Sequence, residues 1–328
     1  MSITRTNAKK FIAKGVGAAL DSETLQMAEE SLQRGFSDWQ AAKNWNFLLK
    51  DSTLGFTVSS VTLTQSSSSV SAPSSGAFDG INIGVGLTDS GSKLGANTTV
   101  SAVTRSATDG TITAITLSTP VVGATGSVTL TVAGDIPLLN LVQDYNLPPD
   151  FYEPYHMRML TKRLPLDYIQ YRYWNMKIID HTIAGLPVAY TVYNPVSADT
   201  QNYGTYRFRV FRIPSDGTTV VGTSYDTVTL QYYRKFNFDS DPLDIPDRYL
   251  YKFLDYCQWL FMMKKNAVDE RLPAMQALAT AALQSAMVDD EELAEEEGQH
   301  RMVSQMESGL IPRPLWSNSQ FSIYYGEL

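Results

Sequence analysis

The stretch VTLQYYRKFNFDSDPLDIPDRYLYKFLDY, residues 228–256, predicts one strand joined to one long helix. Residues 228–233 alternate between β-branched and aromatic side chains, which is typical of a half-buried strand because successive side chains point to opposite faces. An acidic loop with prolines follows. Pro246 fits the first turn of a helix, where its missing N–H is not needed, and Asp247 favours the positive end of the helix dipole. Nothing in the stretch forms a catalytic constellation.

The helix after Pro246 is expected to bury one face. Its apolar residues recur with the spacing i, i+3, i+4 and i+7, which is the period of an amphipathic helix: Leu250, Phe253, Leu254, Cys257, Leu260 and Phe261. The same spacing predicts a short helix over residues 7–20 and a longer one over 22–49. Pro273 is expected to interrupt the pattern, and a last helix over 274–297 is expected to bury Met275, Leu278, Ala282, Leu283 and Met287.

The fold class that follows is α+β. We predict a bundle of about four helices next to a small antiparallel sheet, with strands at residues 188–193, 206–213 and 227–233. Arg207, Arg209 and Arg212 alternate with apolar residues in the second of these strands. They indicate either a solvated arginine face, which we favour, or a binding face.

Residues 55–134 differ in composition and predict an inserted β-sandwich-like domain. Between residues 52 and 134 only Lys93 and Arg105 are basic, while Ser, Thr, Gly and Val dominate. Short strands are expected at 80–87, 98–104, 111–117 and 127–132, and the Asp109-Gly110 pair indicates a hairpin. The serine run at 66–75 predicts an exposed or flexible loop. Residues 1–54 and 135–297 then form one core, and 298–328 an extended C-terminal arm.

The order of these motifs resembles that of the head-to-tail adaptor proteins of tailed phages, also called tail tubular protein A-like proteins. The resemblance rests on the strand ending in Tyr232, Tyr233 and Arg234, the acidic loop, the Ile-Pro pair and the long helix. The upstream stretches 147–151 and 164–169, followed by Trp174, agree with it. It covers roughly residues 1–50 and 136–297.

The resemblance implies a structural virion protein, not an enzyme. Such a protein would form a ring of twelve copies in the neck between capsid and tail, dock on the portal protein and contact a tail tube or nozzle protein. DNA would pass through its channel without sequence-specific binding, and the chain would be made in the host cytoplasm. No cofactor or metal is implied.

Two sets of residues are the candidates for contacts with partners. The first is a portal-docking arm with apolar and aromatic anchors, which dominate interface energies: Leu310, Ile311, Leu315, Trp316, Phe321 and Tyr324. The second set is expected either between subunits or in the core: Tyr232, Tyr233, Arg234, Trp39, Trp45 and Trp259.

Composition excludes several other classes of protein. The formal net charge of −8 and the pI near 5.0 argue against a general nucleic-acid binder. The single cysteine, Cys257, excludes an internal disulfide, and we expect it to be a buried packing residue. No apolar run reaches the roughly 18 residues needed to cross a membrane, and the N-terminus has no good signal-peptide pattern.

No motif for chemistry stands out. His156, His181 and His300 lie far apart without metal-binding spacing. Asp239, Asp241 and Asp244 lack the glycine and distal glutamate of a calcium loop, so a turn is favoured over a cation site.

Two alternatives from other classes remain. A carbohydrate-binding β module on a helical oligomerisation domain would expose aromatic residues in 55–134, where only Phe56 and Phe78 occur. A tail-associated hydrolase would need a paired acid/base site, which the sequence does not show.

Overall fold

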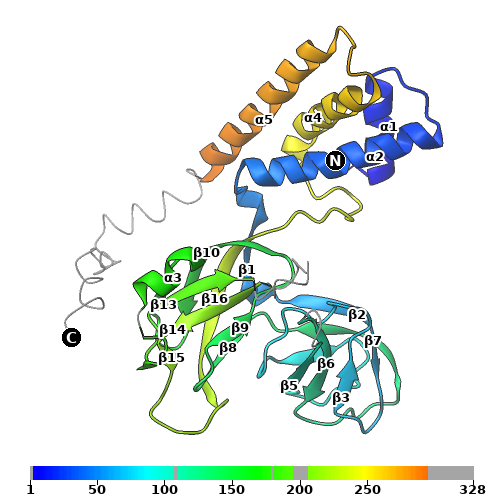
Figure 1. Ribbon diagram of the computed structural model, residues 1–328. Coiled ribbons are helices and arrows are strands. Elements are labelled where there is room, and N and C mark those ends of the chain that lie inside the picture. Colours follow the sequence, from blue (N-terminus) through cyan, green and yellow to red (C-terminus); the bar gives the residue numbers. More distant parts are fainter. Residues whose placement is uncertain (1–2, 107–109, 179, 195–205, 295–328) are drawn as a thin grey trace. The chain divides into compact units, whose positions relative to one another are not determined.

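The computed structural model describes residues 3–106, 110–178, 180–194 and 206–294. The chain is a mixed α+β protein, as predicted. Its described residues form two units: a helical unit of the residues up to Leu49 and from Lys235 onward, and a sheet unit from Lys50 to Arg234 (Figure 1). Tertiary contacts thus group the large sheet with residues 55–134, whereas the sequence placed that sheet with the helices. The predicted division into core, insert and arm stays a prediction.

The described residues of the helical unit form four α-helices. Side-chain caps start two of them: Thr4 accepts a hydrogen bond from the Asn7 N–H, and Asp21 accepts one from the Thr24 N–H. Pro246 immediately precedes the third, and Pro273 lies in the first turn of the fourth, where a missing N–H is tolerated. The four are α1 (Arg5–Gly15), α2 (Ser22–Ala42), α4 (Asp247–Lys265) and α5 (Leu272–Ala294).

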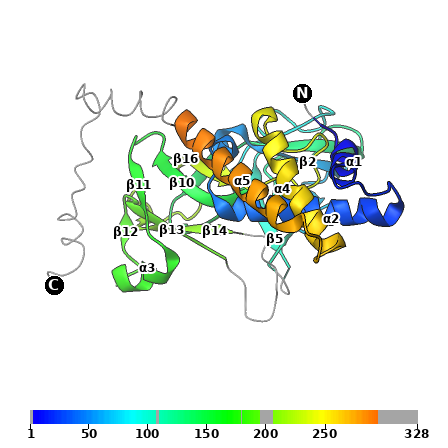
Figure 2. The same cartoon turned by 90° about the horizontal axis from the view of Figure 1, so that it is seen from above.

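Helix α4 is the centre of the helical unit. It contacts α1, α2 and α5, and in both views it runs beside α5 (Figure 1 and Figure 2). All six apolar residues predicted for its buried face are buried. Phe253 packs its ring against Phe36 and Trp39 of α2, at centroid distances of 4.7 and 5.2 Å. Offset and edge-to-face ring pairs of this kind add to the free energy of burial.

Three predictions about the helices are wrong in detail. The first helix ends at Gly15 and not at residue 20. The second ends at Ala42 and not at residue 49, because the chain turns back there: the Trp45 indole N–H donates to the Trp39 carbonyl at 2.7 Å, and the two rings stack at 4.9 Å. A 3-10 turn, η1 (Asn46–Leu48), follows. Leu278 of α5, expected to be buried, is 60% exposed.

The main sheet is larger than predicted and is not purely antiparallel. It has the strand order β1-β16-β10-β11-β13-β14-β9, with β8 paired to β16. Strands β11 and β13 are parallel, because α3 (Tyr171–Lys177) lies in the connection between them. The strands are β1 (Leu49–Asp51), β8 (Ile136–Leu139), β9 (Asp144–Asn146), β10 (Phe151–Met159), β11 (Pro165–Tyr168), β13 (Ala189–Tyr193), β14 (Arg207–Phe211) and β16 (Ser224–Arg234).

One side of this sheet carries its core. Residues of β10, β14 and β16 dominate it, among them Met157, Phe208 and Leu230, each with no exposed surface. A smaller cluster surrounds Trp174 beneath α3. A separate pair of short strands, β12 (Ala184–Gly185) and β15 (Ile213–Pro214), is parallel.

Residues 55–134 form two three-stranded sheets around a core of their own. The orders are β2-β7-β4 and β3-β6-β5. The predicted strands near 98–104, 111–117 and 127–132 are present, but most of 80–87 lies outside the strands. The serine run contains a strand, contrary to expectation, because Val70 points into the core at 1% exposure. The strands are β2 (Phe56–Leu63), β3 (Ser69–Ser71), β4 (Leu87–Asp89), β5 (Val100–Arg105), β6 (Ile112–Leu117) and β7 (Gly126–Val132).

The chain passes into and out of this segment through two adjacent glycines. Gly55 has a φ of +63°, a conformation that favours glycine, and directly precedes β2, whose Phe56 lies opposite Val132 of β7. A Cβ on Gly134 would lie 1.5 Å from the Ser52 carbonyl oxygen and 2.4 Å from the Gly55 nitrogen. Only a residue without a side chain fits this crossing.

Candidate functional site

Exposed tyrosines gather on β10, β11 and α3 of the sheet unit. Three of them contact a tyrosine of another strand: Tyr155 contacts Tyr233, Tyr168 contacts Tyr190, and Tyr171 stacks on Tyr193. Tyrosine is enriched at protein interfaces because it buries a large, rigid ring and keeps a polar tip. We call this set the exposed tyrosines: Tyr152, Tyr155, Tyr168, Tyr171 and Tyr173. Sequence reasoning used this region only as a family motif and missed its exposure.

The tyrosine and arginine at the end of β16 take different positions. Tyr232 is 1% exposed and its hydroxyl donates to Asp150 Oδ1 at 2.7 Å, so it packs within the chain's own core. Burial, together with the negative charge of Asp150, raises the pKa of Tyr232. Lys50 binds the other oxygen of Asp150 at 2.8 Å. Tyr233 and Arg234 are half-buried, and a role for them between subunits stays a prediction.

The predicted tryptophans also separate into two groups. Trp39 and Trp45 have no exposed surface and pack on each other in the helical unit. Trp259 is half-buried at the side of α4, with its ring 5.3 Å from that of Tyr256. The portal-docking candidates Leu310, Ile311, Leu315, Trp316, Phe321 and Tyr324 lie outside the described residues.

The outward side of α5 is unusually apolar for a surface helix. Ala279 and Ala286 are buried against the unit, yet Leu278 and Val288 on other sides of the helix are 60% and 52% exposed. A helix that is apolar nearly all round is normally covered on more than one side. This makes the outer side of α5, which we define by Leu278 and Val288, a second candidate contact surface.

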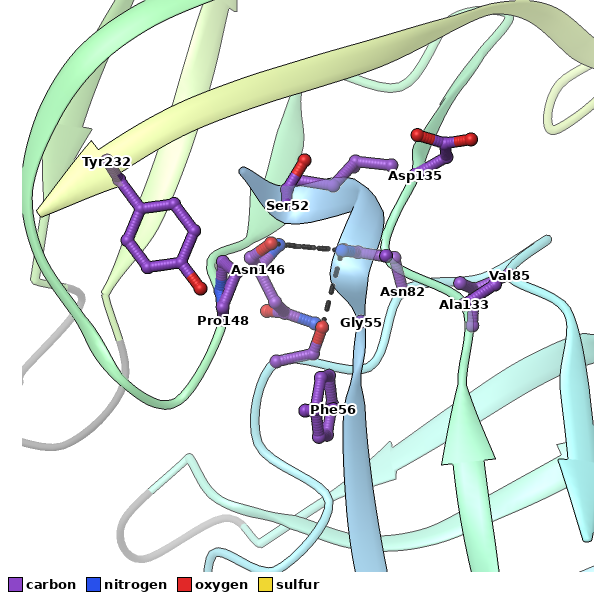
Figure 3. Close-up of a pocket in the computed structure, with 13 residues that line it drawn as sticks. Ser52, Gly55, Phe56, Asn82, Val85, Ala133, Asp135, Asn146, Pro148 and Tyr232 are labelled. Atoms are coloured by element: carbon purple, nitrogen blue, oxygen red, sulfur yellow. Dashed lines mark hydrogen bonds between the residues drawn. The ribbon is translucent and has the colours of Figure 1, made fainter. Parts of the chain in front are cut away.

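A polar junction joins residues 55–134 to the main sheet. The side chain of Asn82 imitates a strand: its amide donates to the Asn146 carbonyl at 2.9 Å, and its oxygen accepts from the Asn146 N–H at 2.7 Å. Figure 3 shows the two asparagines joined in this way, in a small recess that Gly55, Phe56 and Ala133 also line. The Asn146 side-chain oxygen in turn accepts from Arg105 at 2.7 Å.

The arginine face of β14 contains a strong ion pair. Arg209 donates to both oxygens of Asp144, at 2.7 and 2.9 Å, a two-bond geometry that is stronger than a single contact. The Tyr193 hydroxyl donates to the same carboxylate at 2.9 Å. Arg207, by contrast, has no carboxylate at hydrogen-bond distance among the described residues.

The titratable residues form no reactive constellation. Cys257 is fully buried between α2 and α4, and burial raises its pKa, so the thiolate that would act as a nucleophile is disfavoured. Burial lowers the pKa of His156, and the nearby Arg158 lowers it further. Within the described ranges, no group of three or more His, Cys, Asp or Glu side chains could hold a metal ion.

The acidic loop before α4 is organised by hydrogen bonds. An Asp241 oxygen accepts from the Arg5 N–H at 3.0 Å, and an Asp244 oxygen accepts from the Asn237 N–H at 2.9 Å. These bonds fit the turn that the sequence favoured over a cation site.

Comparison with known families decides what kind of protein this is. Residues 96–305 match the family described as SU10 adaptor protein, which is more than half of the chain. The chain belongs to the SU10 adaptor protein family. The resemblance to a tailed-phage adaptor, drawn from the motifs around Tyr232 and Ile245, is therefore confirmed, and the protein is a phage structural adaptor. No curated protein matches the chain.

The matched range also sets limits. It contains the main sheet from β8 onward, the exposed tyrosines and both long helices α4 and α5. It ends before Leu310, the first of the predicted docking residues, and begins inside the 55–134 segment. None of the helices among the described residues is both long and apolar enough to span a membrane.

Proposed function

We propose that this SU10 family adaptor forms a ring that docks on the portal protein and links it to the tail. The observation that carries the proposal is the family match over residues 96–305. The ring would have twelve copies, lie in the virion neck and contact a tail tube or nozzle protein, as the family resemblance implies. The chain would be made in the host cytoplasm and would act by bridging, without catalysis.

The exposed surfaces support an assembly role. The exposed tyrosines and the outer side of α5 offer the aromatic and aliphatic anchors that interfaces use. We assign the outer side of α5 to contacts between copies, because covering Leu278 and Val288 removes apolar surface from water. The exposed tyrosines and the arm at 298–328 are left for the tail and portal proteins.

The net charge supports passage of DNA without gripping it. A chain with 34 Asp and Glu against 26 Lys and Arg carries a negative field in each copy of a ring. Negatively charged side chains repel the phosphates of DNA, so an acidic channel would let DNA slide through. Passage of DNA past this protein is part of the proposal.

Residues 55–134 are best explained as an insertion. Gly55 and Gly134 lie next to each other where the segment begins and ends. The segment can therefore be inserted between β1 and β8 without disturbing the pairing of both strands with β16. The division into a core of 1–54 and 135–297, this insert and an arm is proposed on that basis. The insert would decorate the outside of the ring.

The carbohydrate-binding alternative requires exposed aromatic residues in the insert. Phe78 is fully buried and Phe56 packs against the core of the insert. No other aromatic residue occurs in residues 55–134, so the insert has no exposed aromatic platform for a sugar ring.

Mass measurement tests the proposal. The chain alone should be a small species, and mixing with the portal protein of the same phage should give a complex containing a ring of the adaptor. Leu278→Glu should weaken ring formation at least tenfold, while Val268→Glu, at an 89% exposed position between α4 and α5, should not. A chain that never associates with the portal protein would overturn the proposal. If both variants formed rings equally well, the assignment of α5 to contacts between copies would be wrong.

A further inference from the structure

A recess in the sheet unit is lined by two arginines from different parts of the chain. It has a volume of about 180 Å³ and lies between β5 of the insert and strands β9 and β14 of the main sheet. Arg105 ends β5 and Arg207 begins β14. Ile83 and Val103 contribute apolar wall, and Asn146 and Asp144 add polar groups.

Arg207 brings hydrogen-bond donors that nothing in the described chain uses. Its backbone lies in the ladder between Asn146 and Tyr193, which fixes where the side chain starts. The side chain is half-buried, and its Nε is shielded from solvent without a hydrogen-bond partner among the described residues. A buried donor left unpaired costs free energy, so such a group usually has a partner in the functional state.

Arg105 lines the same recess, and among the described residues its hydrogen bonds go to neutral groups only. It donates to the Gly110 carbonyl at 2.9 Å and to the Asn146 side-chain oxygen at 2.7 Å. Burial first and the positive charge of Arg207 second lower the pKa of Arg105 to about 10, although Asp79 and Tyr193 oppose this effect. Two like charges therefore act on each other across the recess.

The acidic groups nearby are already engaged. Asp144 accepts from Arg209 through two bonds and from Tyr193, so its charge is matched by Arg209. Asp79 accepts from the Ile112 N–H at 2.9 Å. The recess thus keeps an excess of positive charge and free N–H donors, which is the reverse of the whole chain's charge.

We propose that this recess binds an oxyanion, a carboxylate or a phosphate, between Arg207 and Arg105. The planar guanidinium matches both anions through paired N–H donors, and the anion would neutralise the repulsion between the two arginines. Because Arg105 belongs to the insert and Arg207 to the main sheet, the bound anion ties the two together. This site goes beyond the adaptor role and does not depend on it.

Two sources can supply the same chemistry. One is a free oxyanion such as inorganic phosphate. The other is a carboxylate side chain of a second copy of this chain, which is rich in Asp and Glu. A free anion binds the single chain and raises its unfolding temperature, whereas a carboxylate from a second copy shows itself as self-association that depends on Arg207.

The experiment uses the full chain, with inorganic phosphate as the probe against chloride at matched ionic strength. Unfolding temperature and calorimetric affinity are measured for wild type, Arg207→Gln, Arg207→Lys and the control Arg158→Gln, which removes an exposed arginine from β10. Sedimentation of each variant at several concentrations measures self-association. Circular dichroism confirms that each variant is folded.

A free anion predicts that phosphate raises the unfolding temperature of wild type and Arg158→Gln, with at least tenfold weaker binding in Arg207→Gln and an intermediate effect in Arg207→Lys. A carboxylate source predicts at least tenfold weaker self-association of Arg207→Gln, with phosphate competing in wild type. Phosphate binding unchanged in Arg207→Gln overturns the proposal. No effect of phosphate beyond chloride, together with self-association that does not depend on Arg207, overturns it as well.

Discussion

At the scale of single residues, Gly35 sets how closely α2 and α4 approach. A Cβ at this position would lie 2.6 Å from Cys257 Sγ and 3.3 Å from a ring carbon of Phe253. Both neighbours are fully buried, so neither side chain can turn aside into solvent. The helices can therefore meet at this point only because residue 35 lacks a side chain.

Gly35→Ala is expected to lower the free energy of unfolding by about 1–3 kcal/mol, the usual cost of overpacking a core. Adding Cys257→Ala should relieve the clash, so the double variant should lose less than the sum of the two single variants. Chemical denaturation measures all three. Gly15→Ala is the matched control, because the atoms nearest to its Cβ belong to the flexible end of Gln258; equal losses at both glycines would contradict this account.

Trp45 shows what residue patterns miss. Its spacing from Trp39 and Ala42 continues the helical stripe, and the sequence accordingly predicted one helix to residue 49. The structure instead uses Trp45 to fold the chain back, through a hydrogen bond to the Trp39 carbonyl and a ring stack. Periodicity identifies a side chain as buried without telling whether the backbone that carries it is helical.

At the scale of elements, the insert is attached to the sheet by side-chain hydrogen bonds. Asn82 satisfies both the N–H and the carbonyl of Asn146, the last residue of β9. Asn82 and Asn146 are both buried, so water does not readily replace these bonds. The junction therefore depends on side-chain hydrogen bonds, of which Asn82 makes two and Arg105 a third.

Asn82→Ala is expected to destabilise the sheet unit by about 1–3 kcal/mol, because it leaves buried backbone groups of Asn146 unpaired. The amide of Asn146 should exchange its hydrogen faster, which mass spectrometry or NMR can follow. Asn175→Ala, at an exposed position on α3, is the control and should change neither quantity. Unaltered exchange at Asn146 would show that another contact holds the insert in place.

The elements also differ in how visible they are in the sequence. Helix α4 was predicted nearly to its ends, and strand β16 nearly to its C-terminal end, because each has a strong period and a clear stop or start signal there. The strand begins three residues earlier than predicted, at Ser224. In the main sheet, the long strand β10 and the short strands β1, β8, β9 and β11 were not predicted; the short ones have three or four residues, and two of them contain proline. These strands form because they pair with other strands, above all with β16 and β10. The local sequence does not show which distant strand will be the partner.

At the scale of the whole molecule, the arm at 298–328 is the part of the proposed function that rests on sequence alone. It contains apolar and aromatic residues at Leu310, Trp316 and Phe321 without helical or strand periodicity. Anchors of this kind contribute most of the binding free energy when they are buried against a partner. We therefore keep the assignment of this arm to the portal as a proposal.

Ending the chain at residue 297 is expected to abolish binding to the portal protein, while circular dichroism and the unfolding temperature change little. In the full chain, Trp316→Ala should weaken portal binding by about 2 kcal/mol or more, the level of an interface hot spot. Asn318→Ala, two residues away in the same arm, should leave binding nearly unchanged. Portal affinity that survives truncation would assign docking to the exposed tyrosines or to α5.

The sequence by itself determined the α+β class, the buried face of α4, the strand that contains Tyr232 and the adaptor family. These properties depend on local period, on residues that start and stop elements, and on the order of motifs along the chain. Only the tertiary structure decided the eight-stranded mixed sheet, the exposure of Tyr155 and Leu278, and the meeting of Arg105 with Arg207. Those features depend on which distant segments pair, and pairing follows from the packing of the whole unit, which no local pattern contains.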